Sequence, residues 1–153
     1  MRVHFTIGVA LVAASSLIGV AGIGQAVGAG GRPLATELDP AEEVPGPGDS
    51  NATGHADITL NQGREEVCFD LDWSDVDGTV VAAHIHVGAA GVAGPVVVPL
   101  FSGAFAGTDE ATGCVDVDAD LVKAIRQSPS SYYVNVHSVP SFPAGAVRGQ
   151  LGD

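Results

Sequence analysis

Apolar and polar residues alternate along much of the chain after residue 50, which is the pattern of β-strands with one buried face. The two clearest runs are separated by Asn61-Gln62-Gly63 and read as a hairpin. Their apolar positions share one face: Ala56, Ile58, Leu60, Val67, Phe69, Leu71 and Trp73. We therefore expect Trp73 to lie in the core with Phe69 and Leu71.

Further strands follow from the same alternation, and Gly- and Pro-rich turns separate them. They are expected at 34–38, 79–87, 95–101, 113–117, 132–137 and 146–151. In 79–87 the alternation sets Val81, Ala83, Ile85 and Val87 against Val80, Ala82, His84 and His86. The segment 39–51 carries too many Pro and Gly residues for a helix or a central strand, so it is expected to be a loop.

A single helical pattern lies at 118–127. Leu121, Val122 and Ile125 fall on one side of it, and Asp118 or Asp120 is available as its N-cap. About eight short strands and one short helix predict an all-β fold, an antiparallel Greek-key-like β-sandwich or barrel.

The first 29 residues differ from the rest of the chain. A basic Arg2, a long uncharged apolar stretch and small residues up to Ala29 predict a secretory signal peptide, and an uncleaved membrane anchor is the alternative. Residues 30–33 are then a flexible lead-in and 34–152 one β domain. The predicted location is outside the cell or in the cell envelope, with no stable membrane span after cleavage.

Charge and cysteine content narrow the class of protein. With 18 acidic and 6 basic residues the formal charge is -12, and the basic residues form no run, so nucleic-acid binding is not expected. In an oxidising compartment Cys68 and Cys114 are most simply one disulfide, and two free thiols are the alternative. Both cysteines fall on the polar faces of their strands, where the sulfurs can meet outside the core.

Three histidines carry the sharpest chemical signal. His84 and His86 stand two residues apart on a strand and so point the same way, and His137 lies on the polar face of a later strand. If the strands are neighbours, the imidazoles suit Zn or Cu, with His55 and Asp57 as less favoured additions. The alternative is structural: the histidines donate hydrogen bonds to carbonyls of the 88–94 and 140–145 loops. We expect the trio at one edge of the sandwich.

No catalytic residue is assigned. The serines have no nucleophile-elbow context, and there is no Gly-rich phosphate loop followed by Lys.

Several motifs, in order and spacing, resemble the CHRD domain, the module named from its repeats in chordin. They are Glu43-Val44-Pro45, Thr53-Gly54-His55-Ala56, Ala83-His84-Ile85-His86-Val87-Gly88, Gly94-Pro95-Val96-Val97, Tyr133-Val134-Asn135-Val136-His137 and Gly145-Ala146-Val147-Arg148-Gly149-Gln150-Leu151. One departure is Ala146, where the family commonly has Glu. Within these motifs Glu43, Asn135 and Arg148 are expected to be structural, with Arg148 bonding to a carboxylate such as Glu43 or to loop carbonyls at one end of the sandwich.

The signal peptide, the resemblance over nearly the whole mature chain and the missing catalytic residues together predict an extracellular binding module without catalytic activity. Its partner is expected to be a protein, a wall polymer or a metal ion. A metalloprotein of oxidoreductase type is the alternative, because the His-x-His strand has a loose analogy to copper-zinc superoxide dismutase. The further zinc-site pattern of that enzyme is not found in the sequence.

Overall fold

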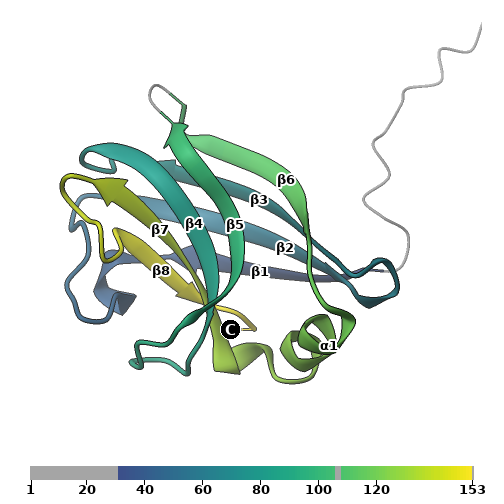
Figure 1. Ribbon diagram of the computed structural model, residues 1–153. Coiled ribbons are helices and arrows are strands. Elements are labelled where there is room, and N and C mark those ends of the chain that lie inside the picture. The colour runs from purple at the N-terminus through teal and green to yellow at the C-terminus, as the bar shows by residue number, and fades with distance from the viewer. Residues whose placement is uncertain (1–30, 106–107, 153) are drawn as a thin grey trace, which may run out of the picture.

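The computed structural model describes residues 31–105 and 108–152, and they form two facing antiparallel sheets (Figure 1). One sheet has the order β1 (Arg32–Leu38), β2 (Thr53–Asn61), β3 (Glu66–Ser74) and β6 (Glu110–Asp116). The other has the order β5 (Val96–Phe105), β4 (Thr79–Val87), β7 (Tyr132–Val139) and β8 (Val147–Gln150). The sheets do not close into a barrel, so the predicted all-β fold is a sandwich.

The core lies between the two sheets and comes from alternate residues of each strand. The predicted hairpin is β2 and β3, and its apolar face is buried as expected, including Phe69 and Trp73. Both of these rings pack against Phe101 from the opposite sheet, at centroid distances of 6.2 Å and 5.9 Å. These aromatic contacts join the two layers.

The alternation predicted for β4 is wrong at its start. Val80 is buried and Val81 is only partly buried, whereas Ala83 and Ile85 keep the predicted inward orientation. A register shift between Val80 and Ala82 explains the difference, because a bulge inserts one residue and reverses the faces on one side of it. The histidines lie beyond the bulge and keep their predicted parity.

Helix α1 (Ala119–Gln127) connects β6 to β7 and therefore carries the chain from one sheet to the other. The Asp118 side chain caps it by accepting from the Asp120 amide, as the sequence predicts. Val122 and Ile125 are fully buried. The helix is thus held against the end of the sandwich by its apolar side.

The predicted loop after β1 contains one short 3-10 turn, η1 (Pro40–Glu42). A proline is tolerated there because the first helical position needs no amide hydrogen. Further short turns are η2 (Gln62–Arg64) and η3 (Pro129–Ser131). Two backbone hydrogen bonds between Asp39 and Arg148 link this loop to β8 and bring Glu43 to the outer face of the second sheet.

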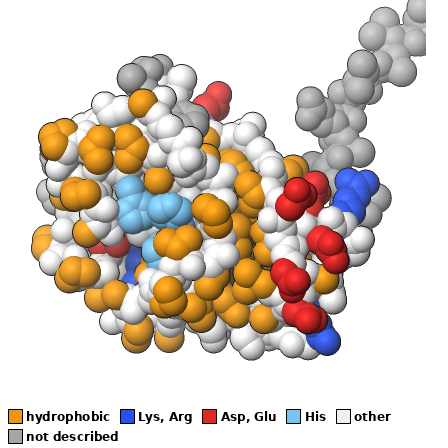
Figure 2. Space-filling model, viewed as in Figure 1, with side chains coloured by type: hydrophobic (Ala, Val, Ile, Leu, Met, Phe, Trp, Pro, Cys, Tyr) orange, Lys and Arg blue, Asp and Glu red, His pale blue; other side chains and the backbone are white. Residues whose placement is uncertain are grey.

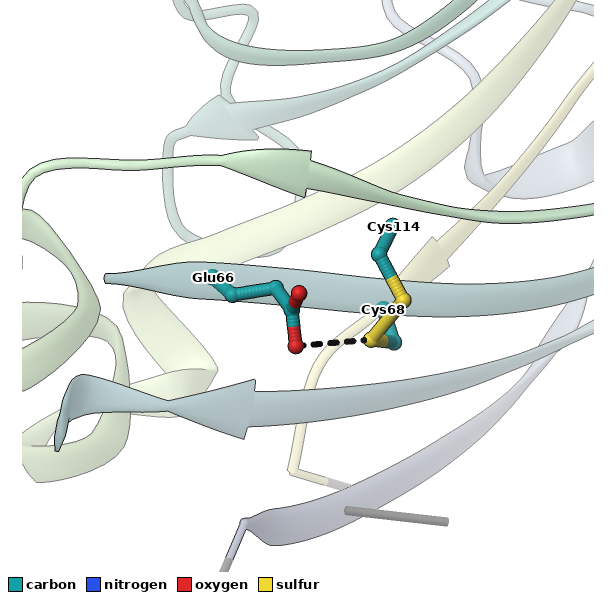
Figure 3. The surroundings of a disulfide bond; sticks show 3 residues. All are labelled: Glu66, Cys68 and Cys114. Carbon is teal, nitrogen blue, oxygen red and sulfur yellow. Dashed lines mark hydrogen bonds between the residues drawn. A yellow bond between two sulfur atoms is a disulfide. The ribbon is translucent and has the colours of Figure 1, made fainter. Parts of the chain in front are cut away.

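The predicted disulfide between Cys68 and Cys114 is present (Figure 3). The two residues face each other across β3 and β6, on the outer side of the sheet. Glu66 Oε1 lies 3.4 Å from Cys68 Sγ. A disulfide sulfur has no hydrogen to donate, so this is a contact and not a hydrogen bond.

In the part of the chain that the structure describes, no helix is long and apolar enough to cross a membrane. The predicted signal peptide, residues 1–29, lies outside the described residues.

Candidate metal centre

His84, His86 and His137 lie together on the outer face of the sheet formed by β5, β4, β7 and β8. The sequence does not show whether the two histidine-bearing strands are neighbours, and the structure shows that they are. Strands β4 and β7 pair directly, with His84 opposite Asn135 and Ala82 opposite His137. These are the two central strands of the sheet. The expectation of a cluster at an edge is therefore wrong: it lies over the middle of one sheet.

The three rings converge on one point. Each histidine offers a ring nitrogen within 4.8 Å of those of the other two. His84 Nδ1 is 3.1 Å from His137 Nε2, and the ring centroids of His84 and His86 are 5.6 Å apart. Bridging by a single ion needs only small side-chain adjustments from such distances.

Two of the rings are fixed by backbone carbonyls. His86 Nδ1 donates to the Gly94 carbonyl at 2.8 Å, and His137 Nδ1 donates to the Pro143 carbonyl at 3.2 Å. Because a carbonyl only accepts, each bond fixes the hydrogen on Nδ1, and the Nε2 of a neutral ring keeps a free lone pair. The hydrogen bonds predicted by the structural alternative are thus present for His86 and His137, and they leave one nitrogen of each of these rings for a metal.

His86 is the most enclosed of the three. Its ring stacks on Tyr133 with the planes 9° apart and the centroids separated by 4.7 Å. The Gly94 amide donates to the Tyr133 hydroxyl, so the same loop residue holds both rings. His86 is 8% exposed, and its Nε2 is buried without a hydrogen-bond partner among the described residues. A buried, unpaired acceptor is costly unless it binds something.

Gly94 is required for this arrangement. A Cβ at this position would stand 1.6 Å from the Val87 carbonyl oxygen, a backbone atom that cannot move aside easily. The loop therefore approaches the end of β4 closely enough for His86 to reach the Gly94 carbonyl.

The electrostatics of the cluster favour neutral rings. Burial and the neighbouring His137 and His86 lower the pKa of His84 to about 4. Burial also lowers the pKa of His137, against the opposing effect of the Pro143 carbonyl. Only unprotonated imidazole binds a metal, so these shifts keep ligand nitrogens available below neutral pH.

A buried polar layer continues from the histidines toward β8. The Arg148 guanidinium lies over the ring of Tyr133, on which His86 also stacks, with its carbon 3.4 Å from the ring centroid. Arg148 also donates to the carbonyls of Ala89 and Val92. Gln150 supports the same loop by donating to the Gly88 carbonyl. Of the two partner types predicted for Arg148, loop carbonyls are the ones it hydrogen bonds.

Glu43 approaches this layer from the loop after β1. Its carboxyl group is buried against Gly145, where a Cβ would stand only 2.4 Å from Oε1. Burial raises its pKa to about 7, against the opposing effects of Arg148 and of a hydrogen bond from the Asn135 side chain. Glu43 thus lies beside Asn135, which in turn contacts His137 through an Oδ1 to Nε2 distance of 3.0 Å.

His55 and Asp57 are not part of this cluster. They lie on β2 of the other sheet, where His55 Nδ1 is 3.1 Å from a Glu37 carboxylate oxygen and its Nε2 is 3.6 Å from Asp57. The proposed addition of these two residues to the His84, His86 and His137 set is not supported by their positions.

Tyr133 and Gly94 occur in the motifs that resemble the CHRD domain, but sequence reasoning gave neither of them a role at the site. Tyr133 carried a usable signal, because it shares strand parity with Asn135 and His137. Gly94 carried none, because the close approach to Val87 depends on the path of a loop in space.

The arrangement is that of a neutral imidazole site on a mostly apolar surface. Figure 2 shows histidine side chains gathered on one face with hydrophobic side chains around them. Neutral imidazoles suit Zn and Cu. A second group, Glu66, Cys68 and Cys114, also brings candidate ligand atoms together. Its sulfurs are joined in the disulfide, and a metal needs thiolates.

By its fold and site the protein is an antiparallel β-sandwich with one disulfide and a cluster of three histidines on an outer face, among the described residues. The family model for the CHRD domain matches residues 34–151, nearly all of the described chain, so the chain belongs to the CHRD domain family. Searches among curated proteins and among solved structures found no match.

Proposed function

We propose that this protein is a secreted or cell-envelope binding module without catalytic activity, and that it binds one Zn or Cu ion through His84, His86 and His137. The observation that carries the proposal is the convergence of three ring nitrogens within 4.8 Å. The carbonyl bonds at Nδ1 of His86 and His137 support it, because metal-binding histidines usually donate their second ring nitrogen to such a partner.

An extracellular location is supported by two observations. The CHRD resemblance implies an extracellular module, and the Cys68–Cys114 disulfide is of the kind that persists in oxidising compartments. An intact mass of the protein from the culture medium that begins between Val27 and Gly31 tests the location together with signal cleavage. Recovery only with the cell membrane and with residues 1–29 retained would favour the anchor.

Metal binding is tested on protein purified without a histidine tag. Calorimetric titration with Zn²⁺ and with Cu²⁺, followed by elemental analysis after desalting, should give one tightly bound ion per chain. His84→Ala, His86→Ala and His137→Ala should each weaken binding by at least tenfold. His55→Ala is the matched control and should bind as the wild type does, because His55 lies on the other sheet.

Two results would contradict the metal site. The first is no uptake of either metal by the wild type. The second is an equal loss of affinity in His55→Ala, which would mean binding to surface histidines in general.

The partner beyond the metal is proposed to be an extracellular protein or a wall polymer. The formal charge of -12 supports a partner other than nucleic acid, because an acidic surface repels phosphates. The oxidoreductase alternative requires a redox-active copper ion. Superoxide dismutation by the copper-loaded protein that is lost in His86→Ala would replace the non-catalytic proposal.

A further inference from the structure

Asn135 lies within the histidine cluster, and its side-chain oxygen contacts His137. It lies on β7 between Tyr133 and His137 and directly opposite His84 on β4. Its side chain is buried, with 2% of the residue exposed, and its Oδ1 is 3.0 Å from His137 Nε2. That nitrogen is the same one that faces His84 Nδ1 at 3.1 Å.

The His137 ring has two oxygen neighbours but, when neutral, only one N–H to donate. The Pro143 carbonyl faces Nδ1 and the Asn135 oxygen faces Nε2, and both are acceptors. A neutral imidazole has one N–H, so it can donate to only one of these two oxygens. With the hydrogen on Nδ1, two lone pairs face each other between Nε2 and Oδ1, and a cation between them would bind both.

Turning the Asn135 amide over would remove this conflict, but Glu43 opposes it. Asn135 hydrogen bonds to Glu43, and because a carboxylate only accepts, it is the amide NH₂ that points to Glu43. The oxygen then points to His137. Amide orientation is assigned from such a partner, and Glu43 is the partner that favours this one.

The distances from His137 Nε2 to Asn135 Oδ1 and to His84 Nδ1 also fit ligand atoms that bind the same ion. Two ligand atoms bound to the same zinc at about 2.1 Å each lie roughly 3.0 to 3.5 Å apart. The two contacts at His137 Nε2 measure 3.0 Å to Asn135 Oδ1 and 3.1 Å to His84 Nδ1. An amide oxygen beside imidazoles is known as a weak further ligand in copper sites.

We infer that the Asn135 side-chain oxygen is a fourth protein ligand, which completes the metal site of His84, His86 and His137, and that Glu43 holds the amide in the orientation that binding requires. The inference rests on the proposed metal site and adds a ligand and a positioning residue to it. The site would then have four protein ligands, three imidazole nitrogens and one amide oxygen.

The first test is metal affinity with the Asn135→Ala variant. Zn²⁺ affinity should fall by about tenfold, and the visible absorption of the Co²⁺-substituted protein should change in energy or intensity. Asn61→Ala is the matched control, because Asn61 is a buried asparagine on β2 of the other sheet. Its Zn²⁺ affinity should remain within threefold of the wild type.

A second measurement follows the Asn135 side chain in the wild-type protein. In uniformly ¹⁵N-labelled wild-type protein, saturating Zn²⁺ should shift the side-chain NH₂ resonances of Asn135, because coordination of the oxygen withdraws electron density from the amide nitrogen. The resonances are assigned by their disappearance in Asn135→Asp. The NH₂ resonances of Asn61, which lies on the other sheet, serve as the reference and should not shift.

The outcomes separate this inference from the proposed function. No Zn²⁺ uptake by the wild type would remove the metal site and the inference together. Uptake that depends on the three histidines, with unshifted Asn135 resonances or with wild-type affinity and Co²⁺ spectrum in Asn135→Ala, would keep the metal site and overturn Asn135 as a ligand. Glu43→Gln should weaken Zn²⁺ affinity less than Asn135→Ala does, and an equal or greater loss would contradict its positioning role.

Discussion

At His86 and His137 each ring nitrogen has a separate task. Nδ1 donates to a loop carbonyl, and Nε2 keeps a lone pair that can bind a metal. Loop support and metal binding, which the sequence presents as alternatives, are therefore compatible in one residue. The physical reason is that imidazole has two nitrogens on opposite sides of a rigid ring.

Glu43 gives a prediction on pH dependence. Its pKa is about 7 in the folded protein and 4.5 in an unperturbed carboxyl group, so between these values the folded state binds more protons than the unfolded state. Stability contributed by protonated Glu43 is complete below pH 4.5 and is lost as pH rises through 7, by on the order of 3 kcal/mol. Urea unfolding of metal-free wild type and Glu43→Gln at several pH values should show this as a difference curve that favours the variant as pH rises.

Comparison with the variant is needed because the histidines act in the opposite direction. The pKa of His84 is lowered to about 4, so its contribution is present above pH 6.5 and is lost as pH falls toward 4. A wild-type curve alone would contain both effects. A difference curve that is flat from pH 4.5 to 8 would contradict the assignment to Glu43.

Trp73 gives a prediction on core packing. It is 3% exposed and contacts Phe101 across the sandwich, so Trp73→Ala should lower the free energy of unfolding by about 3 to 5 kcal/mol. Denaturant unfolding measures the change, and Val92→Ala, at an exposed loop position, is the control. A loss below about 1 kcal/mol in Trp73→Ala would mean that the β3 side chains do not fill the core as described.

Among the elements, the 88–94 loop between β4 and β5 supports the metal site. It supplies the carbonyl for His86 and carbonyls for Arg148, and Gly94 approaches the Val87 carbonyl more closely than any side chain allows. Loop and strand therefore determine the site together.

Gly94→Ala should consequently move the loop and reorient His86. We expect a stability loss of about 1 to 3 kcal/mol from overpacking, together with a loss of Zn²⁺ affinity. Gly91→Ala is a control in the same loop. Its φ is +75° and no atom lies within 4 Å of an added Cβ, so it should cost only about 1 to 2 kcal/mol of backbone strain and leave the affinity unchanged. Equal effects of both variants on affinity would show that the loop does not position His86 through Gly94.

At the scale of the whole molecule, stability has two separate sources. The core joins the two sheets, whereas the disulfide joins β3 and β6 on the outside of one sheet. The bond closes a loop that contains β4 and β5 of the other sheet, with a sequence separation of 46. It therefore restricts the unfolded chain across both layers.

Replacement of Cys68 and Cys114 by Ser should lower the free energy of unfolding by up to about 4 kcal/mol, the value that the chain-entropy model gives for a loop of this length. Denaturant unfolding of the double variant and of the reduced wild type should agree. Zn²⁺ affinity should be unchanged in the folded double variant, because the cysteines lie on the sheet that does not carry the histidines. A large loss of affinity would indicate coupling between the sheets that the geometry does not provide.

The sequence by itself determined which side of each strand faces the core, because side-chain direction alternates locally with every residue. That local rule was enough for an all-β sandwich or barrel, the inward Phe69 and Trp73, the outward position of both cysteines and the shared face of the histidines. It failed at Val80 and Val81, where a bulge breaks the alternation. Only the tertiary structure decided that β4 and β7 are central neighbours, and that the loops at Gly94 and Pro143 reach the rings. These contacts join residues far apart in the chain, and their geometry depends on how whole strands pair and how loops pack over them, which no local pattern encodes.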